Sequence, residues 1–112
     1  MENTRVALFN VSFLVKKMQE KGISVDSITD EEYLSMSSGF WSIDDDIAEQ
    51  FNHVAAVYGG KIKAVFNVRC WSIEGSSSCR PICSFNQALT KQYYNKEVGF
   101  FRPLKYKSLT EL

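Results

Sequence analysis

Two tryptophans are the side chains of this sequence best suited to hold a flat ligand. Trp41 follows a glycine-containing break, and Trp71 ends a long run of strand-forming residues. An indole face can stack on any nucleobase, a contact worth roughly 1–3 kcal/mol per base. We therefore expect Trp41 and Trp71 to lie near a base-stacking pocket. The alternative is that both are packing anchors, because large aromatic side chains dominate small cores.

Polar and basic residues alternate along the same strand-forming run. They are Lys61, Lys63, Asn67 and Arg69. Because alternate residues of a strand share one face, these side chains could all reach one phosphate backbone. A solvated outer face of a strand would show the same pattern. Cations and aromatic residues are also interleaved between 91 and 107, which is typical of single-strand binders and of ordinary edge strands.

The remaining reactive side chains form no recognisable catalytic motif. His53 is the only histidine, and we expect it to be a partly exposed structural residue at the start of a strand. Together with Cys70, Cys79 and Cys83 it has the composition of a zinc site, but zinc sites usually show two tightly spaced pairs. Glycine-rich phosphate loops and paired-carboxylate motifs are missing from the sequence. We predict a protein that is not an enzyme and has no cofactor or metal.

Length and composition predict one globular domain over residues 1–112. Of these residues, 45% are hydrophobic and 23% are charged, without the charge excess of a disordered chain. We find neither a leader-like N-terminus nor an apolar run of membrane-spanning length. An odd number of cysteines favours reduced thiols. We therefore expect a cytoplasmic protein that does not contact a membrane.

The charges are distributed unevenly although their sum is zero. Residues 1–60 carry four basic and ten acidic side chains, a net charge of −6. Residues 61–112 carry nine basic and three acidic side chains, a net charge of +6. This asymmetry suggests an anionic partner for the second part, or two parts that neutralise each other in the fold.

The first half of the sequence predicts a strand followed by helices. Residues 6–11 form a short apolar run typical of a buried strand, and helical spacing from Ser12 stops at Gly22. Thr29 and Glu32 have the spacing of a capping box at the start of a second helix. Three acids at 44–46 open a third helix, whose dipole they stabilise.

The second half predicts a run of strands. Residues 54–71 form a β-hairpin around Gly59-Gly60, with Ile62, Ala64, Phe66 and Val68 toward the core. The composition of 74–78 predicts a loop. Further short strands are expected at 82–85, 92–94, 98–101 and 103–106, with a turn of helix near 86–89. The predicted class is therefore α+β.

Several of these segments resemble a group of small PUA-like proteins, related to ASCH, EVE and YTH domains, from bacteria and phages. In that group a glycine-x-tryptophan leads into a helix, a strand, a glycine turn and a second strand that ends on an aromatic residue. The matching segments here are 39–43, 54–66 with Trp71, Phe85, 94–99 and 102–106. Ser38 stands where the similar proteins usually carry a basic residue.

The resemblance implies a small twisted β-barrel or sheet flanked by short helices, which binds RNA or modified bases. Our leading hypothesis is therefore a nucleic-acid or modified-base binding module that uses Trp41 and Trp71, with the strand 61–69 as an electrostatic wall. The rival hypothesis is a protein-binding module, for example a phage-encoded inhibitor of a host defence or nuclease factor. The neutral net charge favours the rival, because nucleic-acid-binding domains are usually more basic.

Overall fold

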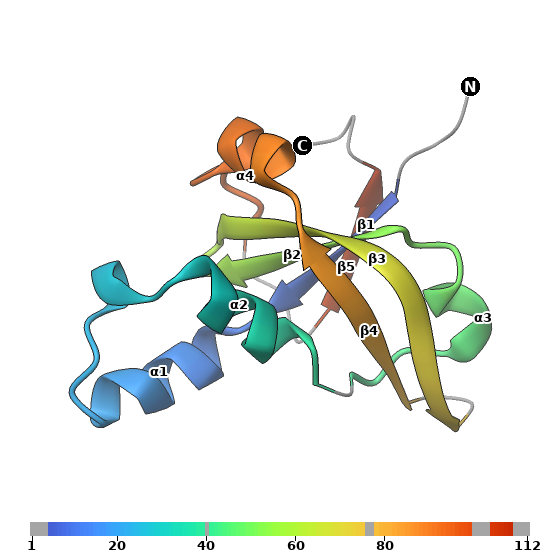
Figure 1. Ribbon diagram of the computed structural model, residues 1–112, viewed down its shortest axis with the longest axis horizontal. Helices are drawn as coiled ribbons and strands as arrows, with labels where there is room; N and C mark the ends of the chain where they lie inside the picture. The colour runs from blue at the N-terminus through green and yellow to red at the C-terminus, as the bar shows by residue number, and fades with distance from the viewer. Residues whose placement is uncertain (1–4, 40, 76–77, 100–103, 109–112) are drawn as a thin grey trace.

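The described part of the chain folds as one strand, a run of short helices, and then four more strands, with one helix between the last two of them (Figure 1). The computed structural model describes residues 5–39, 41–75, 78–99 and 104–108. Its elements are β1 (Arg5–Asn10), α1 (Ser12–Glu20), the 3-10 helix η1 (Val25–Ser27), α2 (Asp30–Ser37), α3 (Asp45–Ala48), β2 (His53–Tyr58), β3 (Lys61–Gly75), β4 (Ser78–Phe85), α4 (Gln87–Tyr93) and β5 (Leu104–Ser108). The predicted α+β class is confirmed.

The five strands form one mixed sheet in the order β4-β3-β2-β1-β5. The strands β1 and β2 are parallel, and every other neighbouring pair is antiparallel. In the described residues β4 and β5 pair only with β3 and β1 respectively, so the strand pairings do not close a barrel. None of the helices in this part of the chain is both long and apolar enough to cross a membrane.

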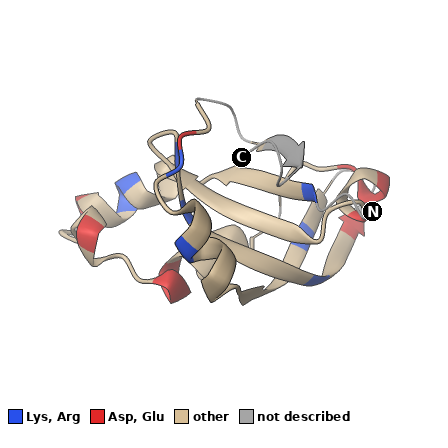
Figure 2. Ribbon diagram, turned by 90° about the horizontal axis from the view of Figure 1, so that it is seen from above, with Lys and Arg blue, Asp and Glu red and all other residues tan. Residues whose placement is uncertain are grey.

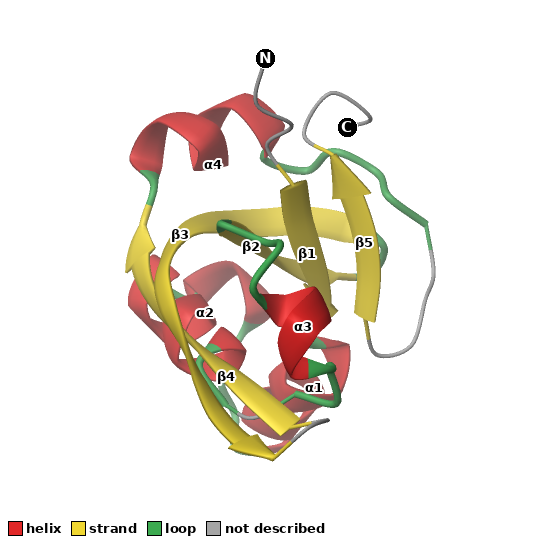
Figure 3. Cartoon of the chain, turned by 90° about the vertical axis from the view of Figure 1, so that its right-hand side faces the viewer, coloured by secondary structure: helices red, strands yellow, loops and turns green. Residues whose placement is uncertain are grey.

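Both faces of the sheet are covered. Helices α1 and α2 lie together on one side, and α4 lies apart from them across the sheet (Figure 3). The layer under α1, α2 and α3 contains the buried rings of Phe9 and Phe66. The layer beside α4 contains Leu8 and Val65, with Leu89 packed against them. A central strand buried on both faces reads as a continuous apolar run, which is why 6–11 could be predicted.

Local sequence signals account for the helix and turn boundaries. Thr29 Oγ1 accepts a hydrogen bond from Glu32 N (3.2 Å), and Glu32 Oε1 accepts one from Thr29 N (3.0 Å), which confirms the capping box. Gly59 and Gly60 have φ values of 60° and 77° in the hairpin turn. Such values disfavour residues with a β-carbon, so the glycine pair specifies the turn and, with it, the pairing of β2 with β3.

Three β-bulges interrupt the alternation of β3, at Lys63, Arg69 and Glu74. Ala56 lies opposite Ala64 whereas Val57 lies opposite Ile62, so Lys63 is an extra residue in β3. Ile62 consequently packs in the layer beside α4, while Ala64 and Phe66 pack in the other layer. Ile62 therefore faces the core as predicted, but in the opposite layer from Ala64 and Phe66. The second bulge lies at Arg69, between the pairs Val68–Cys83 and Cys70–Ile82.

The helix α4 replaces a predicted strand. Residues 92–93 belong to this helix, which is longer than the expected turn at 86–89, and Asn86 Oδ1 caps it by accepting a hydrogen bond from Leu89 N (2.9 Å). The Thr90 hydroxyl accepts from Val65 N (2.8 Å) and donates to Val65 O (3.1 Å). The hydroxyl thereby satisfies the backbone amide and carbonyl of Val65 on β3, beyond the end of β4. The local sequence does not signal this role.

The hairpin between β3 and β4 is longer than the sequence predicted. The pairing continues to Gly75 and Ser78, so β3 and β4 take up residues 74, 75 and 78 of the predicted loop 74–78. The expected strand at 98–101 is not formed by Val98 and Gly99, and its other residues lie outside the described part of the chain. On the outer edge of β4, Cys79 O accepts from Trp41 N (2.8 Å), and Cys79 N donates to Trp41 O (3.1 Å).

Candidate functional site

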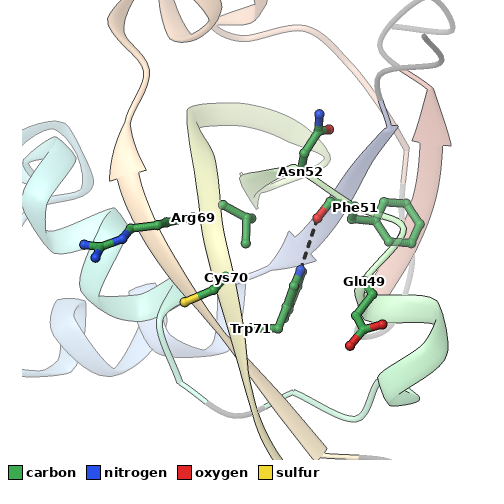
Figure 4. Close-up of a pocket in the computed structure, with 7 residues that line it drawn as sticks. Glu49, Phe51, Asn52, Arg69, Cys70 and Trp71 are labelled. Carbon is green, nitrogen blue, oxygen red and sulfur yellow. Dashed lines mark hydrogen bonds between the residues drawn. The ribbon is translucent and has the colours of Figure 1, made fainter.

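A pocket of about 360 Å³ opens where β3 extends beyond β2. The last residue of β3 paired with β2 is Asn67, opposite His53; after it, β3 continues in partnership with β4 alone. The segment that leads into β2 forms the facing wall. We call this site the Trp71 pocket; its lining residues are Glu49, Phe51, Asn52, Val68, Arg69, Cys70 and Trp71 (Figure 4). Its volume lies within the usual range of small-ligand sites, about 300–1,000 Å³.

The Trp71 indole is a fixed wall of this pocket. Its Nε1 donates a hydrogen bond to Phe51 O at 3.1 Å (Figure 4). Its ring meets Phe9 edge-to-face, with ring centroids 6.5 Å apart and an interplanar angle of 69°. Trp71 is half-buried, so part of the side chain remains at the surface. A ring held in this way gives a preorganised surface, which reduces the entropy lost when a ligand binds.

Polar side chains of both charges contribute to the lining of the pocket. Glu49, Asn52 and Arg69 are exposed and line the pocket. Asn52 also joins the two walls of the pocket, because its backbone carbonyl accepts a hydrogen bond from Val68 N at 2.9 Å. Arg69 is the bulge residue, and in Figure 4 its guanidinium points away from Asn52. Bulges often re-aim a side chain in this way.

Trp41 does not line the Trp71 pocket. It is buried, with 7% of its surface exposed, and its ring stacks on Phe9 with centroids 4.2 Å apart and planes 25° apart. Its Nε1 donates to Ser37 O at 3.1 Å. The packing alternative therefore describes Trp41, whereas Trp71 combines packing with a position at the pocket.

The expected basic row on β3 is not one continuous face. Lys63 and Arg69 are the extra residues of two of the bulges in β3, so simple alternation is broken on both sides of Asn67. Lys63 Nζ donates to Asn95 Oδ1 (2.7 Å), and Asn67 Oδ1 accepts from Asn86 Nδ2 (2.8 Å). Lys61 is exposed near the turn. Of the four residues, only Arg69 lines the Trp71 pocket.

The cysteines occupy different environments. Cys79 is buried, and its Sγ donates to Ile43 O at 3.3 Å. Burial raises the pKa of the Cys79 thiol, with a further contribution from the nearby acids Asp45, Asp44 and Glu49, and burial raises the pKa of Cys83 to about 12. Both thiols are therefore protonated near neutral pH. Cys70 is exposed, and among the described residues no three His, Cys, Asp or Glu side chains lie close enough to hold a metal ion.

His53 titrates in a way that links pH to stability. Burial lowers its pKa from the ordinary value of 6.5, and a side-chain hydrogen bond with Asn67 opposes this shift. The unfolded chain therefore binds this proton more readily than the folded protein does. Its neutral form supports folding fully above about pH 6.5, and stability is lost as the pH falls below that value.

We expect His53→Gln to reduce the loss of stability between about pH 7.5 and 5.5, because glutamine does not titrate in this range. Urea unfolding midpoints of both proteins at the two pH values test this expectation. Equal changes in the two proteins would show that His53 is protonated as easily in the folded state as in the unfolded state.

Several lining residues of the pocket were not predicted from the sequence. Glu49, Phe51 and Asn52 precede β2 as an ordinary helix end and connection, and only the register of β2 with β3 places them opposite Trp71. In comparisons with known proteins, the chain matches no family model, no curated protein and no solved structure. The chemistry of the pocket is therefore the guide to its ligand.

Proposed function

We propose that the protein is a non-catalytic module that binds nucleic acid, or a modified base, in the Trp71 pocket. The observation that carries this proposal is a fixed indole bordered by the exposed polar side chains of Glu49, Asn52 and Arg69. Stacking on the indole is sequence-tolerant, and hydrogen bonds from the neighbouring side chains would add selectivity.

Glu49 and Asn52 match the hydrogen-bonding edge of a base, because a carboxylate accepts from an exocyclic amine and an amide can both donate and accept. The Arg69 guanidinium, which points away from Asn52, suits a phosphate beside the base (Figure 4). A base can reach such a pocket from a single strand, or after it has been flipped out of a duplex. The pocket volume of about 360 Å³ leaves room for a base and its substituents.

The lining of the pocket favours binding rather than catalysis. Cys70 is its nucleophilic side chain, and histidine, the usual partner that activates a thiol, is not among the lining residues that the structure describes.

The three unpaired thiols Cys70, Cys79 and Cys83 agree with a reducing compartment such as the cytoplasm.

We further propose that the open, twisted sheet is related to the small sheet of PUA-like domains. Bulges bend and twist strands, and barrels use them to turn corners. The bulges of β3 support this proposal, since β3 and β4 curve together (Figure 3).

The binding proposal predicts two kinds of loss. Arg69→Ala should weaken binding to all oligonucleotides alike. A plot of the logarithm of its binding constant against the logarithm of the salt concentration should become shallower by about one unit of slope, because fewer counterions are released on binding. Trp71→Phe should weaken binding with little change in slope, since it alters the stacking surface but not charge. Fluorescence anisotropy over a range of salt concentrations measures both effects.

Lys17→Ala is the matched control for charge, because Lys17 is exposed on α1 and does not line the pocket. It should leave both affinity and slope near those of the wild type. Circular dichroism of each variant confirms that the fold survives. If wild-type protein shows no salt-sensitive binding to plain or modified DNA or RNA at protein concentrations of roughly tens of micromolar, the proposal is wrong.

A protein-binding module is the second candidate function. The net charge is zero, and acidic residues gather toward opposite ends of the molecule, around α2 and α3 (Figure 2). Acidic surfaces repel phosphate and attract basic protein surfaces. Recovery of one protein from a host lysate, unchanged by nuclease treatment, would favour this function.

A further inference from the structure

A second groove lies between the start of α2 and the helix α4. It has a volume of about 550 Å³ and shares no lining residue with the Trp71 pocket. We call it the Tyr94 groove; its lining residues are Asp30, Phe85, Gln87, Thr90, Lys91 and Tyr94. A smaller pocket of about 130 Å³ adjoins it through the shared residues Asp30 and Tyr94.

The Tyr94 ring is exposed but held in place. Its exposed fraction is 56%, and Lys63 Nζ lies 5.4 Å from the ring centroid. Lys63 lines the smaller pocket and is not among the lining residues of the groove. Asn95 fixes the ammonium by accepting its hydrogen bond at 2.7 Å. Tyr94 itself lines the groove, so part of its exposed surface faces a ligand there.

The groove combines aromatic surface with hydrogen-bonding groups. Phe85 is 38% exposed and lies at the end of β4, so two large aromatic side chains line the same groove. Gln87 and Lys91 are one helical turn apart on α4 and are exposed. An amide, an ammonium and the Asp30 carboxylate thus surround the aromatic surface.

We infer that the Tyr94 groove is a stacking site for a base of single-stranded nucleic acid. A purely apolar ligand would leave the amide and the two charges unmatched, whereas a base carries acceptors and donors around a flat ring. Lys91 can approach a phosphate next to the stacked base. Bases inside a duplex already stack on each other, so a ring at the protein surface selects for single strands.

This inference shares its ligand class with the proposed function and rests on it to that extent, but the residues are different. The two sites can therefore be tested separately. A titration of ¹⁵N-labelled protein with a short single-stranded oligonucleotide, and with the duplex of the same sequence, reads out both sites at once. We expect the single strand to shift the backbone amides of 85–94, and the duplex to leave them unchanged.

Tyr94→Ala should weaken binding of the single strand by about 5- to 150-fold, which corresponds to the loss of one stacked base. Tyr94→Phe keeps the ring and should bind almost as the wild type does. Phe13→Ala is the matched control, because Phe13 is a 54% exposed aromatic residue outside the groove. It should leave affinity unchanged.

The outcomes separate the two proposals. If Tyr94→Ala keeps the affinity of the wild type, and the amide shifts lie only around the Trp71 pocket, the groove is not a binding site and the proposed function remains intact. Shifts confined to 85–94 would support the groove and contradict the Trp71 pocket. Equal shifts with the duplex would overturn the assignment to single strands. If neither oligonucleotide binds the wild type, the groove proposal is wrong, and the proposed function is then decided by its own test with modified bases.

Discussion

Phe66→Ala is expected to lower the free energy of unfolding by about 3–5 kcal/mol, a large share of the roughly 5–15 kcal/mol that is typical of a folded domain. Phe66 is completely buried on β3 and lies opposite Val54 of β2. Its ring also packs at 6.1 Å from that of Phe85. Truncation removes this apolar contact and leaves a cavity between the sheet and its helices.

Urea unfolding followed by circular dichroism measures this loss. Phe85→Ala is the matched control, because it removes the other ring of the same aromatic contact, at a position that is 38% exposed. It should destabilise the protein less than Phe66→Ala does. A Phe66→Ala variant with the unfolding midpoint of the wild type would mean that the faces of β3 are assigned wrongly.

Trp41→Ala is expected to destabilise the fold by a similar amount, about 3–5 kcal/mol. The stack on Phe9 and the hydrogen bond from Nε1 to Ser37 O are both lost, whereas the backbone bridge to Cys79 can persist. Trp71→Ala should destabilise less, since Trp71 is only half-buried. Chemical unfolding of the two variants under the same conditions makes the comparison.

The two tryptophans should also differ in what they do to binding. Trp41→Phe keeps an aromatic ring against Phe9, so it should retain oligonucleotide affinity. If a folded Trp41→Phe variant loses affinity as strongly as Trp71→Phe, Trp41 contributes directly to the site. That result would restore the original expectation that both indoles contact the ligand.

Features encoded within a few residues could be predicted from the sequence. The capping box at Thr29 and Glu32 and the glycine turn at 59–60 act through adjacent backbone groups, and both were confirmed. The burial of 6–9 followed from a continuous apolar run. In each case, the physical cause and the sequence signal lie in the same short segment.

Features that depend on pairing between distant segments were mispredicted or missed. The bulge at Lys63 arises only when β3 pairs with β2, and it moves Ile62 to the opposite layer from Ala64. The residues 92–93 have strand-like composition, yet they join α4, whose Thr90 hydrogen-bonds to Val65 across the sequence. The Trp71 pocket was half-predicted, because its tryptophan and arginine stand out whereas its facing wall does not.

The bridge between Trp41 and Cys79 has a consequence for how copies of the protein meet. An edge strand with free amides and carbonyls can recruit another chain and begin aggregation. On β4, Trp41 already takes both backbone groups of Cys79, and the next residue in the same outward-facing series is Pro81, which has no amide hydrogen to donate. This stretch of the sheet is therefore a poor template for edge-to-edge growth, even when molecules are crowded together.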